Sequence, residues 1–137
     1  MGNLDRSAAA LRIFGDDLIP EDISKILCAK PTKSFRKGDE EIGRVTRKIR
    51  THKTGGWLLK VERRSPENLE EQIFEILNQL SQEISLWKEL CSRYQVDLFC
   101  GIFMANSNDG LMFSPEALLA LGSRGIKLDL DIYDAAE

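Results

Sequence analysis

The sequence contains few of the residues that catalytic and metal sites usually need. Its 137 residues include three cysteines and a single histidine, His52. Structural zinc sites use about four thiolate or imidazole ligands, with some of them close together in the chain. Neither the glycine-rich loops that bind phosphate nor the nucleophile elbow of hydrolases occurs. We therefore predict no metal, no cofactor and no catalytic residue, and a binding protein more readily than an enzyme.

The three cysteines, Cys28, Cys91 and Cys100, are an odd number and form no closely spaced pair. Because their neighbours are apolar, we interpret them as small buried hydrophobic side chains and not as disulfides. Cysteine catalysis would require His52 beside a thiol, and His52 lies in a basic run that would lower its basicity.

Long hydrophobic runs are also missing. No run approaches the roughly 20 residues needed to cross a bilayer, and the first ten residues carry no secretory signal. We therefore expect a cytoplasmic protein. Hydrophobic residues make up 42% of the chain, which is enough for one core. The expected organisation is a flexible N-terminus at 1–8, a single domain at 9–134 and a tail at 135–137.

The chain repeats a pattern of a strand followed by a helix. An apolar run at 11–14 predicts the first strand, and Pro20 predicts the start of a helix that ends near Ala29. A second strand is predicted at 56–62. The sequence Ser65-Pro66-Glu67 then indicates a helix start, and apolar residues recur at helical spacing as far as Cys91. This predicts one helix of about 26 residues.

A third round begins with a strand at 96–104 and a short strand at 111–113. Ser114-Pro115-Glu116 indicates another helix start, and Gly122 or Gly125 offers a left-handed stop. The apolar face of this helix is predicted to consist of Leu118, Leu119 and Leu121.

Two further strands are indicated by alternation. In the last strand, 126–133, Leu128, Leu130 and Ile132 alternate with polar residues, which predicts one buried face. Residues 44–50 predict an edge strand or a hairpin partner through 54–56. The expected class is α+β, with a largely antiparallel sheet and helices packed on one face. Its topology is predicted as a ferredoxin-like split β-α-β with an extra C-terminal helix and strand.

Charge is distributed unevenly along the chain, although the net charge is only −3. Residues 30–64 contain twelve basic side chains and four acidic ones. With Phe35 and Trp57 nearby, this segment could follow a phosphate backbone. Alternatively, Arg44, Lys48 and Arg50 pair with Asp129 and Asp131 on a neighbouring strand. We favour the internal pairing, and we expect neither nucleic acid nor a membrane surface as a partner.

Two groups of carboxylates and one tryptophan have alternative interpretations. Asp16 and Asp17 follow a strand, and further aspartates lie at 129–134, so oxygen ligands for a cation or an acid and base pair are conceivable. Their spacing matches no calcium loop, and aspartates in turns commonly bond their own backbone. Trp57 is either a binding aromatic on a loop or a core residue, and we favour the core, as we do for Trp87.

Several strings occur together in an order that resembles a bacterial family called domain of unknown function 4279. The resemblance extends from about residue 9 to residue 133. The strings are Leu11-Arg12-Ile13-Phe14-Gly15-Asp16-Asp17-Leu18, Pro20-Glu21, Pro31-Thr32, Phe35-Arg36-Lys37-Gly38, Thr54-Gly55-Gly56-Trp57 and Leu128-Asp129-Leu130-Asp131-Ile132-Tyr133. The resemblance implies a stand-alone bacterial cytoplasmic domain and supplies no catalytic residues.

Two functions follow from these observations. The first is a non-enzymatic protein-interaction module, immunity-like or regulatory, which a surface with charges of both signs would suit. The alternative is a binder or enzyme for a small anionic ligand or nucleotide, using Asp16, Asp17 and basic residues of 33–53. The candidate residues for a ligand or partner are Asp16, Asp17, Arg36, Lys37, His52 and Trp57.

Overall fold

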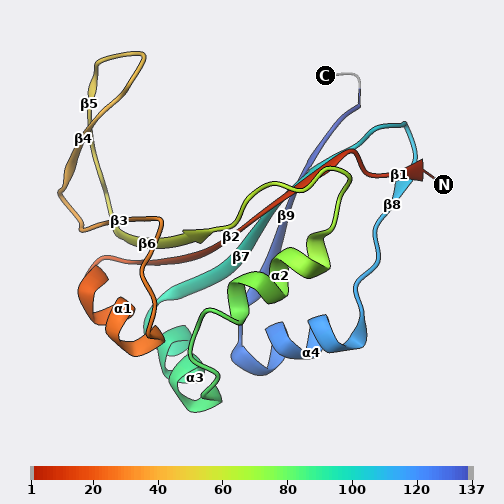
Figure 1. Cartoon of the computed structure of the whole chain (residues 1–137). Coiled ribbons are helices and arrows are strands. Elements are labelled where there is room, and N and C mark those ends of the chain that lie inside the picture. Colours follow the sequence, from red (N-terminus) through yellow and green to blue (C-terminus); the bar gives the residue numbers. More distant parts are fainter. Residues whose placement is uncertain (1, 136–137) are drawn as a thin grey trace.

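A five-stranded sheet carries the helices on one of its faces (Figure 1). The computed structural model describes residues 2–135. Along the sheet the strands are β3 (Lys33–Phe35), β6 (Gly55–Lys60), β2 (Arg6–Gly15), β7 (Gln95–Phe103) and β9 (Lys127–Tyr133). Neighbouring strands are antiparallel except β7 and β9, which are parallel. The predicted α+β class with a largely antiparallel sheet is confirmed.

The strand order shows how the chain is connected. β6 lies between β2 and β3, which run in the same direction, and β2 lies between β6 and β7, which also run in the same direction. Each pair of parallel strands is thus split by an antiparallel strand, and β9 extends the sheet beside β7. The wider assignment to ferredoxin-like proteins stays a prediction.

Four helices are described, and their ends follow local sequence signals. α1 (Pro20–Leu27) has proline at its first position and ends at Cys28, which adopts a left-handed conformation with φ 58°. α4 (Pro115–Arg124) begins after Ser114, whose Oγ accepts a hydrogen bond from the Ala117 N–H at 3.1 Å, and Gly125 ends it at φ 80°. The predicted starts of these two helices are confirmed.

The predicted 26-residue helix is wrong. The segment forms α2 (Leu69–Leu77) and α3 (Ile84–Arg93), and the cap of α2 is Asn68 and not Ser65. Between the two helices, the Gln82 amide donates to the carbonyls of Leu77 and Leu80 at 2.9 and 2.8 Å. These contacts satisfy backbone groups that a continuous helix would use, so α3 can take its own direction against the sheet.

The core lies between the sheet and the helices. Trp57 of β6 and Trp87 of α3 are both fully buried in it, which confirms the core interpretation of the two tryptophans. One polar contact is buried there as well. Ser7 of β2 donates its hydroxyl to Oε1 of Gln72 at 2.5 Å, and the Gln72 amide donates to the Ser7 carbonyl at 3.1 Å. This pair fastens α2 to the central strand.

The division into a flexible segment at 1–8, a domain at 9–134 and a tail stays a prediction, and the structure has strand residues before position 9. β2 already begins at Arg6, Leu4 is buried, and β1 (Gly2–Asn3) pairs in parallel with β8 (Asp109–Gly110). Residues 6–8 belong to the sheet because they pair with the end of β7, where Arg6 lies opposite Phe103. β8 also precedes the short strand expected at 111–113. Residues 1, 136 and 137 lie outside the described residues.

Several apolar side chains that were expected in the core are exposed. In α4 the exposed fractions of Leu118 and Leu119 are 52% and 70%, because Ala117, Leu121 and Arg124 form the inner face. In β9 Leu130 and Ile132 are exposed, because this is an edge strand beyond the cover of the helices. The cysteines also differ: Cys100 is buried, Cys91 is partly buried and Cys28 is exposed. Among the described residues, no helix has the length and apolar character needed to span a membrane.

Residues 40–53 form a separate hairpin, which we call the arm. It contains β4 (Glu40–Ile42) and β5 (Ile49–Thr51), paired with each other and with no other strand of the described chain. The strand predicted at 44–50 is therefore mostly the turn of this hairpin. Residues 55 and 56 belong to β6, so 54–56 do not form a hairpin turn. Figure 1 shows the arm rising from the end of the sheet near β3.

Candidate functional site at the hairpin arm and its base

One end of the sheet brings together three of the strings that carry the family resemblance. Phe14 and Gly15 of β2 lie opposite Gly56 and Gly55 of β6, and Phe35 of β3 lies on the other side of Gly56. A side chain on Gly56 would overlap the Phe35 ring, and one on Gly55 would lie 2.8 Å from the Gly15 carbonyl oxygen. The two glycines therefore allow this close strand packing.

His52 connects the arm to this packed end. Its ring stacks on Phe35, with centroids 3.7 Å apart and planes 12° from parallel. Its Nε2 lies 2.9 Å from Oε2 of Glu41, and Nζ of Lys33 donates to the other oxygen of Glu41 at 3.0 Å. The hydrogen bonds from Lys33 and His52 lower the pKa of Glu41 below its ordinary value. Since His52 is buried, its contacts are those of a residue that holds the arm in place.

Two ion pairs on the surface connect the turn after β3 to neighbouring segments of the chain. Nζ of Lys37 lies 3.4 Å from Oδ2 of Asp16, and Nη2 of Arg36 lies 3.2 Å from Oε2 of Glu21 in α1. A backbone N–H of Glu21 and the Arg36 guanidinium lower the pKa of Glu21. All four side chains are more than half exposed, so water screens both pairs and they contribute little to stability. Asp17 is exposed on the adjoining loop.

A hollow of about 520 Å³ lies next to this end of the sheet. It is lined by Phe14, Gly15, Asp16, Thr54 and residues 92–95. Neither Arg36 nor His52 lines it, so the structure brings the family strings together without forming one pocket from Asp16 and Arg36. Trp57, which was also kept as a candidate binding residue, does not line the hollow: its ring is buried, and its Nε1 donates to Ser24 Oγ at 2.9 Å.

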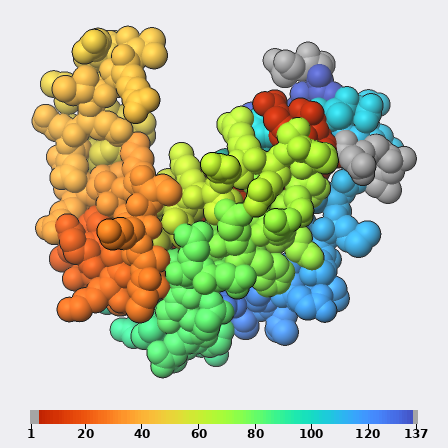
Figure 2. All heavy atoms as spheres, viewed as in Figure 1, coloured from red at the N-terminus to blue at the C-terminus, as the bar shows by residue number. Residues whose placement is uncertain are grey.

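The arm itself is the most cationic exposed element near these residues. Among residues 2–135, five cations of the arm form no ion pair, and three aliphatic side chains of the arm are exposed. The cations are Arg44, Arg47, Lys48, Arg50 and Lys53. The aliphatic residues are Ile42, Val45 and Ile49, with exposed fractions of 64%, 93% and 65%. Figure 2 shows the arm standing apart from the body of the molecule, with a gap between them.

The pairing expected between the arm and the last strand is wrong. Asp129 lies 3.5 Å from Nη2 of Arg12, and Asp131 accepts a hydrogen bond from the Tyr133 hydroxyl at 2.6 Å. β9 is at the opposite edge of the sheet from β3, so its carboxylates cannot reach the arm. Arg44 and its cationic neighbours therefore keep their charge available.

Sequence reasoning missed the residues on the sheet face that the helices do not cover. Arg12 of β2 and Asp97 of β7 meet there, together with Phe99, Phe103 and Tyr133. Alternation in β2 places Arg12 on the face opposite Leu11 and Ile13, but nothing local indicates its partner. Within the described residues, no group of three or more His, Cys, Asp or Glu side chains could hold a metal ion.

Comparison with known proteins identifies one matching family. Residues 5–135 match a family described as a domain of unknown function, DUF4279. The chain belongs to the DUF4279 family. No curated protein and no solved structure gives a significant match. DUF4279 membership covers the arm as well as the sheet, so the arm is part of the matched domain.

Proposed function

We propose that this DUF4279 protein is a non-enzymatic, cytoplasmic interaction module that binds an acidic surface of another protein through its arm. An immunity-like or regulatory role is compatible with such binding. The observation that carries the proposal is the set of five arm cations without ion pairs among the described residues. Cations of this kind raise the rate of association with an acidic partner and add selectivity.

The aliphatic side chains of the arm favour a protein as the partner. Val45 is 93% exposed between Arg44 and Arg47, and burial of such a side chain would contribute to affinity in a protein interface. The arm has no Phe, Tyr or Trp on which a base could stack. The overall charge of −3 also disfavours a polyanion. The mixture of cations and aliphatic residues is therefore better suited to an acidic protein surface with an apolar centre.

The proposal can be tested by crosslinking from the tip of the arm. A photoreactive amino acid replaces Val45 in the full-length protein, and in a second variant it replaces Leu119, which is 70% exposed on α4. In cells of the source organism, we expect position 45 to capture one acidic protein and position 119 to capture none. Capture that is equal at both positions, or that disappears after nuclease treatment, would contradict the proposal.

Charge reversal supplies the matched control. The triple variant Arg44→Glu, Arg47→Glu, Lys48→Glu should abolish capture, because it replaces attraction with repulsion. A triple variant at exposed lysines elsewhere, Lys25→Glu, Lys30→Glu, Lys88→Glu, makes the same change in net charge and should leave capture intact. Equal loss in both triple variants would show that total charge, and not the arm, determines binding.

A further inference from the structure

The outer edge of β9 is an open edge of the central sheet. β9 pairs with β7 on one side, and no other strand of the described chain pairs with it. The Tyr133 carbonyl accepts a hydrogen bond from the Met104 N–H at 3.0 Å, so the odd-numbered residues of β9 turn their backbone groups towards β7. Because these groups alternate in direction along a strand, those of Leu128, Leu130 and Ile132 face outwards. This edge is therefore able to pair with a further strand.

Apolar side chains line the same edge on the helix side of the sheet. Leu130 and Ile132 lie in register with the buried Cys100 and Ile102 of β7, so they belong to the face that carries the helices. Their exposed fractions are nevertheless 37% and 61%, so α4 leaves them uncovered. A strand added at this edge would remove part of their surface from water, which favours its binding.

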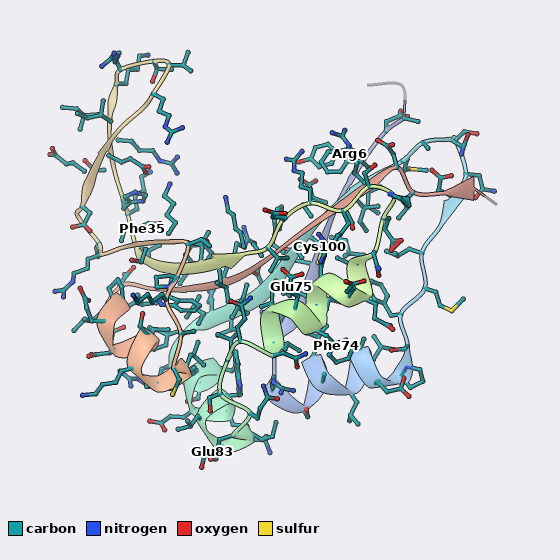
Figure 3. All side chains as sticks on the ribbon, viewed as in Figure 1. Arg6, Phe35, Phe74, Glu75, Glu83 and Cys100 are labelled. Carbon is teal, nitrogen blue, oxygen red and sulfur yellow. The ribbon has the colours of Figure 1, made fainter. Side chains whose placement is uncertain are left out.

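Charged side chains occupy the other face of β9. Strand register places Tyr133 in one row with Phe103 and Arg6, and Figure 3 shows Arg6 on the side of the sheet away from the helices. By alternation, this face also carries three charged residues of β9, namely Lys127, Asp129 and Asp131. The cation is at the start of the strand and the carboxylates follow it. An antiparallel strand of the same sequence would therefore bring the cation of one copy opposite a carboxylate of the other.

We propose that β9 pairs with β9 of a second copy of this chain, antiparallel and with Asp129 at the two-fold axis. In this register Lys127 of each copy lies opposite Asp131 of the other, and Leu128 lies opposite Leu130. The two leucines have outward backbone groups, so each such pair exchanges both of its backbone hydrogen bonds. The sheets of the two copies become one continuous sheet.

Charge selects this register among those that the outward backbone groups permit. Registers centred on Leu130 or Asp131 bring carboxylates together and bring no opposite charges together. A register centred on Leu128 pairs only residues 127–129 of the strand. The proposed register pairs 127–131 and joins cation to carboxylate on both sides of the axis. A foreign strand without a cation at the matching position would meet unpaired carboxylates, which discourages its binding.

The charged groups of each copy are prepared for this pairing. Lys127 forms no ion pair within residues 2–135, so its charge is available to a second copy. The Tyr133 hydroxyl donates to Asp131 at 2.6 Å, which holds that carboxylate in place. The two Asp129 carboxylates meet at the axis, and Nη2 of Arg12 in the same copy lies 3.5 Å from each of them. This arginine reduces the repulsion between them.

Sedimentation velocity of the full-length protein tests the association. From about 1 to 500 μM it should show a monomer–dimer equilibrium with a Kd of roughly 1–100 μM, as a small interface gives. Lys127→Glu and Asp131→Lys should each weaken the dimer about fivefold or more, because attraction becomes repulsion on both sides of the axis. The two substitutions combined should restore the Kd to within about threefold of wild type. Lys88→Glu, at an exposed lysine of α3, controls for net charge and should have no effect.

A cysteine at position 129 tests the register. In the proposed dimer its two copies face each other in a pair without hydrogen bonds, with Cα atoms about 4.5 Å apart, which suits a disulfide. In a background with Cys28→Ser and Cys91→Ser, Asp129→Cys should therefore form a crosslinked dimer under mild oxidation. Lys127→Cys is the control and should not crosslink, because its two copies lie more than about 13 Å apart.

Three results would overturn the proposal. The first is a monomer at every concentration up to about 500 μM. The second is a dimer that the single charge reversals leave unchanged, or that the double variant fails to restore while its thermal unfolding stays that of the wild type. The third is crosslinking at position 127 as fast as at position 129.

A different occupant of the edge would also be visible. If the protein stays monomeric and a photoreactive residue in place of Ile132 captures a different protein in cells, the edge belongs to a foreign strand and the proposal is wrong. The arm variants described above should leave dimerisation unchanged. This proposal and the proposed function therefore fail independently.

Discussion

Arg12 and Asp97 form a bidentate ion pair across the two central strands of the sheet. Nε and Nη2 of Arg12 lie 2.8 and 2.6 Å from the two oxygens of Asp97, and the guanidinium is 4.3 Å from the Phe99 ring centroid. The side chains are only 26% and 20% exposed, so the pair is shielded from water. Such a pair fixes the register of β2 against β7.

Removing one partner of this pair should destabilise the fold. We expect Arg12→Met to lower the free energy of unfolding by about 1–2 kcal/mol, because the Asp97 carboxylate stays partly buried without its donor. Urea unfolding measures this change. Lys37→Met, which breaks an ion pair between two exposed side chains, is the control and should change little. If both variants lose the same stability, shielding of the Arg12 pair has no energetic effect.

A second prediction concerns the buried amide of Gln72. Its Nε2 donates to the carbonyls of Ser7 and Glu62, at 3.1 and 2.9 Å. Gln72→Leu should lower the free energy of unfolding by about 1–3 kcal/mol, because both carbonyls and the Ser7 hydroxyl lose a partner. Chemical denaturation checks this. Gln79→Leu removes an exposed amide from the following turn and should stay within about 0.5 kcal/mol of wild type; an equal effect of both substitutions would contradict the explanation.

The contacts of Glu41 predict how the stability of the arm depends on pH. Because the native contacts lower the pKa of Glu41, its carboxyl group binds a proton less tightly in the folded protein than in the unfolded chain. The stabilisation is therefore fully present above the unfolded value of about 4.5 and is lost as pH falls through the lowered native pKa. Glu41→Gln should be less stable than wild type at pH 6, with the difference shrinking at lower pH.

Hydrogen exchange of the arm amides, followed from pH 6 downwards, measures the same effect locally. Glu40→Gln is the control, since Glu40 is exposed and its neighbour makes the contacts with Lys33 and His52. If the stability difference between Glu41→Gln and wild type grows as pH falls, the predicted pH dependence is wrong.

The cysteines should differ strongly in their reactivity. Burial raises the pKa of Cys100 to about 12, with smaller contributions from Asp97 and Asp129. Cys28 is exposed. At pH 8 an alkylating reagent should therefore modify Cys28 first and leave Cys100 unmodified until the protein unfolds. Mass spectrometry of timed samples checks the order, and early modification of Cys100 would contradict the buried position.

Local signals were sufficient for some ends of elements. Pro20 and Ser114 act on backbone groups within a few residues and mark the helix starts that were predicted, and Gly125 is one of the two glycines expected to end α4. The similar signal at Ser65 failed, because the cap of α2 is Asn68. The break between α2 and α3 was not predictable in this way. The apolar spacing continues across 78–83, and only the folded position of Gln82, which also accepts from Arg124 at 2.9 Å, explains the interruption.

The candidate site was predictable only in part. The family strings identified segments that do meet, because Phe14, Phe35 and Gly56 lie on adjacent strands. Their neighbours in space were not predictable, since Lys37 pairs with Asp16 21 residues away and Arg12 with Asp97 85 residues away. The order of the strands decides such contacts, and the expected pairing of the arm with Asp129 was wrong because β9 occupies the other edge.

β2 lies at the centre of the sheet, yet both strands that flank it come later in the chain. Its first paired residue, Arg6, lies opposite Phe103. During synthesis β2 can pair with β6 once residue 60 has been made, but its hydrogen bonds to β7 wait until residue 103, and contacts so distant in sequence slow folding. β2 carries the uninterrupted apolar run Ala8-Ala9-Ala10-Leu11. While this run is exposed in the nascent chain, it can associate with other chains. A chaperone that binds short apolar segments would find its first target there.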